Sequence, residues 1–83
     1  MKPIEEYFYN REILEIKTSK EFQDLKSLFD GQLDKYKGSW DKYTPFLDIR
    51  IKPYPIFRER YYVDSSNLII VTMDEFYKRL GTN

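Results

Sequence analysis

Hydrophobic and polar residues alternate most clearly in the segment 46–52. Leu47 and Ile49 occupy every second position there, which is typical of a strand with one buried and one exposed face. The segment 56–63 alternates again, with Phe57, Tyr61 and Val63 on its buried side. The turn-forming residues 64–67 follow it, and 68–72 is apolar on both faces. We therefore predict three antiparallel strands, at about 46–52, 56–63 and 68–72, connected in chain order as a meander.

A fourth strand is predicted near the N-terminus. The segment 11–17 has Leu14 and Ile16 pointing to one side. We expect it to extend the sheet beside 68–72. That position would make 68–72 a central strand and would explain why it is apolar throughout.

Two helices begin at capping boxes, in which a Thr side chain and a Glu three residues later bind each other's backbone. Thr18 opens a helix at about 19–30, whose apolar stripe can continue to residue 36. Thr72 opens a helix at 73–80, with Gly81 as its C-terminal cap. The pattern as a whole predicts a single α+β domain over residues 1–83.

The composition adds limits on size and charge. A chain of 83 residues is one small domain, and its 18% aromatic content supplies most of the large apolar side chains. Lys and Arg number 14, as do Asp and Glu, so the overall charge attracts neither nucleic acid nor an acidic membrane. No apolar run is long enough to span a membrane, and no signal peptide is recognisable, so we expect a cytoplasmic protein.

The residues that usually carry chemistry are scarce. The chain has no Cys and no His, which removes thiol nucleophiles, thiolate ligands and the commonest acid–base group. No glycine-rich phosphate loop or zinc-ligand spacing is present. We predict that the protein is not an enzyme and that it has no catalytic residues, no cofactor and no metal site.

One tripeptide resembles part of a catalytic motif. Glu15-Ile16-Lys17 resembles the second half of the active site of PD-(D/E)xK nucleases, in which the acid binds a metal ion. The family also needs an Asp on a preceding strand, and no Asp precedes Glu15 in this chain. We therefore interpret the tripeptide as part of an ordinary strand.

The outward face of the first two meander strands is the one surface with a marked composition. Arginine and tyrosine are favoured at the energetic centres of protein interfaces. We predict a partner-binding surface made of six residues: Arg50, Lys52, Tyr54, Arg58, Arg60 and Tyr62. The plainer interpretation is an exposed sheet face whose long side chains cover apolar neighbours.

Two classes of function could use this surface. The first is a small protein-binding module, of the type that inhibits or regulates a host protein on behalf of a phage or mobile element. The absence of Ala fits the AT-rich coding of such elements. The alternative is a nucleic-acid-binding protein that uses the Arg- and Tyr-rich hairpin. A homodimer formed through the apolar strand and aromatic loops stays open as a third arrangement.

Overall fold

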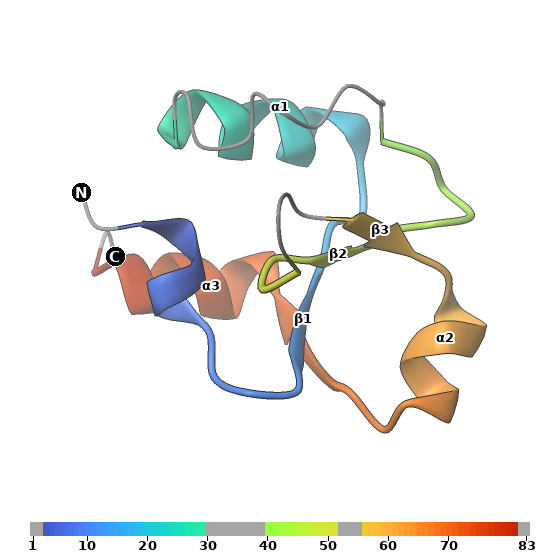
Figure 1. Ribbon diagram of the computed structural model, residues 1–83. Coiled ribbons are helices and arrows are strands. Elements are labelled where there is room, and N and C mark those ends of the chain that lie inside the picture. Colours follow the sequence, from blue (N-terminus) through green and yellow to red (C-terminus); the bar gives the residue numbers. More distant parts are fainter. Residues whose placement is uncertain (1–2, 30–39, 52–55, 82–83) are drawn as a thin grey trace.

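The computed structural model describes residues 3–29, 40–51 and 56–81 (Figure 1). It confirms the predicted α+β class, with a four-stranded sheet and three α-helices among the described residues. In chain order the elements are the 3-10 helix η1 (Ile4–Tyr7), β1 (Glu12–Glu15), α1 (Ser19–Leu28), β2 (Phe46–Asp48), β3 (Ile56–Arg58), α2 (Arg60–Ser65), β4 (Ile69–Thr72) and α3 (Met73–Leu80).

The sheet is mixed, with the strand order β3-β2-β1-β4. β1 pairs antiparallel with β2 and parallel with β4, and β2 pairs antiparallel with β3. The predicted neighbourhood of 11–17 and 68–72 is thus confirmed. The first pairing of the predicted meander, between 46–52 and 56–63, is also confirmed. Its second pairing is wrong, because β4 pairs with β1 instead of with the segment 56–63. As a result β4 lies at the edge of the sheet, and the central strands are β1 and β2.

The predicted strand 56–63 is also wrong in its second half. Only Ile56–Arg58 is a strand, and Arg60–Ser65 forms the helix α2. This helix carries the chain across the sheet, so that the next strand can enter parallel to β1. Val63 then packs against Ile13 and Phe46, which gives the helix its buried side.

Both predicted threonine caps form. The Oγ1 atom of Thr18 accepts a hydrogen bond from the backbone N–H of Glu21 at 3.1 Å. Thr72 accepts the corresponding bond from Glu75 at 3.2 Å, and Gly81 ends α3 with a left-handed φ of 74°. The first helix ends at Leu28, close to the predicted residue 30, and the suggested continuation to residue 36 lies outside the described residues.

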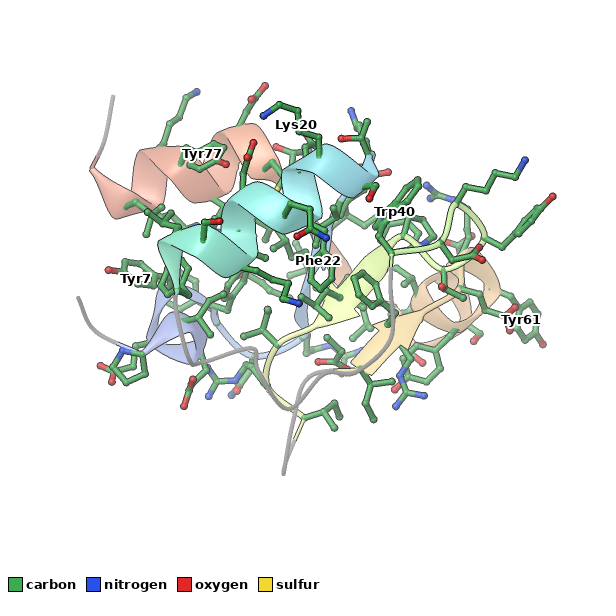
Figure 2. All side chains as sticks on the ribbon, turned by 90° about the horizontal axis from the view of Figure 1, so that it is seen from above. Tyr7, Lys20, Phe22, Trp40, Tyr61 and Tyr77 are labelled. Carbon is green, nitrogen blue, oxygen red and sulfur yellow. The ribbon has the colours of Figure 1, made fainter. Side chains whose placement is uncertain are left out.

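Apolar side chains fill both faces of the sheet. The larger cluster includes Leu14, Leu47 and Phe76 and gathers α1, α3 and η1 on one face. Figure 2 shows Phe22 of α1 pointing toward the strands below the helix. The smaller cluster contains Ile13 on the opposite face, which is covered by α2. In Figure 1 α1 and α2 accordingly lie on opposite sides of the strands.

Candidate functional site

The predicted partner-binding residues come from different parts of the fold. Arg50 follows β2, Arg58 ends β3, and Arg60 and Tyr62 belong to α2. The structure brings Arg58, Arg60 and Tyr62 together, whereas Arg50 is directed to another element. The remaining two predicted residues lie outside the described part of the chain: Lys52 and Tyr54.

Arg50 holds the N-terminal segment in place. Its Nη1 atom donates hydrogen bonds to the backbone carbonyl oxygens of Glu5 and Phe8, at 3.0 and 2.8 Å. Phe8 itself is buried in the larger core. The guanidinium therefore satisfies carbonyl groups at and beyond η1, and this contact is a structural role for a residue that we expected on the open sheet face.

Arg60 packs over a row of side chains on the face covered by α2. The strand register places Arg58 beside Phe46, and Phe46 beside Glu15. The guanidinium carbon of Arg60 lies 4.8 Å from the centre of the Phe46 ring, and its Nη2 atom lies 3.7 Å from Oε2 of Glu15. The aromatic ring and the nearby carboxylate both favour this position of the side chain, 58% of which is exposed.

Arg58 is more deeply placed. Its guanidinium carbon lies 4.2 Å from the centre of the Tyr62 ring. Its Nε atom is buried without a hydrogen-bond partner among the described residues. Asp48 lies on the same face, and burial raises the pKa of its carboxyl group, while the Arg50 backbone N–H and the positive charge of Arg58 oppose that shift.

Tyr61 completes this surface and was not among the predicted residues. Its side chain points away from the protein and is 76% exposed (Figure 2). Sequence reasoning placed it on the buried face of a strand, and the helix α2 reverses that orientation. The six residues of α2 are too few to give a periodic signal of a helix in the sequence. We call Arg58, Arg60, Tyr61 and Tyr62 the α2 surface.

A second exposed apolar feature lies on the edge strand. Ile69 is 57% exposed and Ile70 is 37% exposed. We predicted this segment to be buried on both faces because its residues are all apolar. The structure contradicts that expectation, since β4 has a neighbouring strand on one side only.

A shallow depression lies where the parallel strands β1 and β4 lead into their helices. Its lining includes Glu15, Lys17 and Asp74. The carboxylate of Glu21, also at its rim, accepts a hydrogen bond from the backbone N–H of Lys17 at 2.7 Å as part of helix capping. Within residues 3–29, 40–51 and 56–81, no group of three or more acidic side chains is arranged to hold a metal ion.

Two further findings bear on function. Among the described residues, the helices are all too short or too polar to cross a membrane. Comparison of the chain with models of protein families, with curated proteins and with solved structures found no significant match.

Proposed function

We propose that this chain is a non-catalytic protein-binding module that docks through the α2 surface. The observation that carries the proposal is the 76% exposure of Tyr61, next to an arginine that is anchored and still more than half exposed. Tyrosine and arginine side chains in such positions are typical anchors of protein interfaces.

The two arginines have contacts within the protein that favour their positions before a partner binds. The Phe46 ring and the Glu15 carboxylate hold Arg60, and Arg58 lies over the ring of Tyr62. A side chain that is held in its binding position loses less conformational entropy on binding. The α2 surface therefore combines a large exposed aromatic group with preorganised positive charge.

The chemistry of the α2 surface also indicates which kind of partner surface would be complementary to it. Arg58 and Arg60 carry positive charge, and the exposed Tyr61 ring offers apolar area with a hydroxyl group at its tip. A partner surface with carboxylates around an apolar pocket would complement it. The chain has 14 basic and 14 acidic residues, so its net charge contributes little to recognition. Recognition therefore depends on this local pattern. In the proposal the partner is a host protein that the module inhibits or regulates.

Nucleic acid is the alternative partner. The same tyrosine could stack on a base while the arginines contact phosphates. Arg60 already lies close to the carboxylate of Glu15, which lowers the positive charge available for phosphates. Titration with a single-stranded oligonucleotide at several salt concentrations separates the two cases. Binding that weakens steeply with salt would support nucleic acid.

The main test is affinity capture from the source cells with three forms of the tagged protein. The first is the natural chain, and the second carries Arg60→Glu and Tyr61→Ser. The third is a matched control with Lys42→Glu and Tyr43→Ser, which alters another exposed tyrosine, 73% exposed, with a lysine 5.1 Å from its ring.

We expect the natural chain and the control to capture the same protein, and the α2 variant to lose it. Circular dichroism and urea unfolding should show that all three forms fold. A captured protein that all three forms retain equally, or no specific capture by the natural chain, would contradict the proposal.

A further inference from the structure

The outer edge of β4 carries a short row of backbone groups that point away from the sheet. The backbone N–H of Ile69 donates to the carbonyl of Arg11 at 2.6 Å, so this residue faces β1. Successive peptide groups of a strand point in opposite directions. The outward groups are therefore the carbonyl of Leu68, the N–H and carbonyl of Ile70, and the N–H of Thr72.

The row of outward backbone groups ends at Leu68 and at Thr72. The N–H of Leu68 donates to the carbonyl of Val63 at 3.1 Å and is not available at the edge. The carbonyl of Thr72 belongs to the first turn of α3, because Thr72 is the N-cap of that helix. Two donors and two acceptors remain, and they are arranged symmetrically about Ile70.

The two exposed isoleucines point to opposite faces of the sheet. Ile70 pairs with Ile13 and shares the face covered by α2. Ile69 pairs with Glu12 and therefore lies on the other face. A partner lying on one face could cover only one of these side chains, whereas a strand added at the edge would contact both.

An antiparallel copy of β4 can pair with this edge so that all four outward backbone groups form hydrogen bonds. With the two-fold axis at Ile70, the two Ile70 residues exchange both of their outward hydrogen bonds. The N–H of Thr72 in each copy meets the carbonyl of Leu68 in the other. On the faces, Ile70 lies beside Ile70 of the second copy, and Ile69 lies beside Val71 of the second copy.

From these matches we propose that two copies of this chain associate through β4, antiparallel and centred on Ile70, so that their four-stranded sheets become one continuous sheet. The outward hydrogen-bonding groups belong to Leu68, Ile70 and Thr72, none of which is part of the α2 surface. Each copy supplies a strand and exposed isoleucines that cover the open edge of the other.

The test measures solution mass by light scattering and sedimentation as the protein concentration is raised. The natural chain should form a dimer. Ile70→Lys and Ile70→Glu should each raise the dimer dissociation constant about tenfold or more, because each places two like charges together at the axis. Tyr61→Lys is the matched control, since it puts the same charge on an exposed apolar site away from the edge, and it should still dimerise.

The decisive sample is an equal mixture of Ile70→Lys and Ile70→Glu. If the two positions face each other, opposite charges now meet and the mixed dimer should re-form. A natural chain that stays monomeric at the highest concentration overturns the proposal, as does a dimer that the Ile70 variants leave intact. A mixture that dimerises no more strongly than either variant alone would exclude the proposed register. None of these results depends on the α2 surface, so they leave the test of protein binding independent.

Discussion

The carboxylate of Glu12, in β1, accepts two hydrogen bonds from the guanidinium of Arg79, in the last turn of α3. The nitrogen–oxygen distances are 2.7 and 2.8 Å. The same guanidinium donates to the backbone carbonyl of Tyr7 at 2.9 Å, and the carboxylate also accepts from the backbone N–H of Tyr9 at 2.7 Å. One fork-shaped pair thus joins the last helix to the first strand and to the segment that precedes it.

Removing one member of this pair should destabilise the protein strongly. The side chains of Glu12 and Arg79 are only 8% and 21% exposed. Arg79→Met keeps the apolar stem but leaves the carboxylate without its cation, so we expect the free energy of unfolding to fall by about 2–4 kcal/mol. Urea unfolding at neutral pH measures the change. The double variant Glu12→Gln with Arg79→Met should lose less than the sum of the two single variants, and simple additivity would show that the residues are not coupled.

The pair also predicts how stability depends on acid. The hydrogen bond from Arg79 is the largest cause that holds the pKa of Glu12 below its ordinary value of 4.5, and burial opposes it. Folding therefore gains stability from this carboxylate above about pH 4.5, and loses that gain as the pH falls through the lower folded pKa. Unfolding measured at successive pH values should show this decline. In Arg79→Met the contribution of Glu12 to the decline should be smaller, and an unchanged acid profile would contradict the assignment.

Asp48 should affect the dependence of stability on pH in the opposite direction to Glu12. Burial raises the pKa of its carboxyl group above the ordinary value of 3.8, because the Arg50 N–H and the Arg58 charge do not fully replace water. A raised folded pKa means that folding is favoured by protonation and weakened as the pH rises through that pKa. Asp48→Asn should therefore raise the free energy of unfolding at neutral pH by up to about 1 kcal/mol. Below pH 3.8 the advantage should disappear, and an advantage that persists there would point to packing instead.

The elements that sequence reasoning predicted well are those with local signals. Capping depends on residues three apart, so Thr18 with Glu21 and Thr72 with Glu75 could be recognised without knowing the fold. The same holds for Gly81, whose left-handed φ follows from its place after the last helical turn. Runs of apolar residues, alternating or continuous, likewise located all four strands of the described sheet, although the predicted segments were longer than the observed ones.

Strand pairing could not be predicted in the same way, because alternation states which face is buried and not which strand lies beside it. The turn-forming residues after Val63 indicated a hairpin, and the structure instead has the end of α2 followed by Asn67 with a positive φ of 54°. The candidate surface changed for the same reason. A six-residue helix is too short for a periodic pattern, so Tyr61 was assigned to the interior and the basic face was drawn across Arg50.

The two helix caps allow a matched pair of substitutions. Thr18→Ala and Thr72→Ala each remove one side-chain acceptor from a helix N-terminus, and each should lower the free energy of unfolding by about 1 kcal/mol. Thr18→Ser and Thr72→Ser keep the hydroxyl group and serve as controls, with losses of less than about half that amount. Thermal unfolding compares the four variants. If the serine variants were as unstable as the alanine variants, the methyl group rather than the hydrogen bond would be responsible.

Phe76 should be the most sensitive position tested, because a group of aromatic rings closes around it. Its centroid lies 5.2 Å from that of Phe8, in a stacked arrangement, and 5.8 and 5.9 Å from those of Phe29 and Tyr7. These rings come from η1, from the end of α1 and from α3, so removing the central ring affects three packed segments at once. Phe76→Ala should cost about 3–5 kcal/mol.

A domain of this size has only about 5–10 kcal/mol of stability, so the alanine variant should be partly unfolded at physiological temperature. Phe76→Leu refills most of the space and should fold with a smaller loss. The exposed Tyr61 provides the control, since Tyr61→Ala should change stability by less than about 0.5 kcal/mol. Calorimetry of Phe76→Ala, Phe76→Leu and Tyr61→Ala checks whether their losses of stability follow this order. Equal losses at positions 61 and 76 would mean that the buried rings do not hold the helices to the sheet.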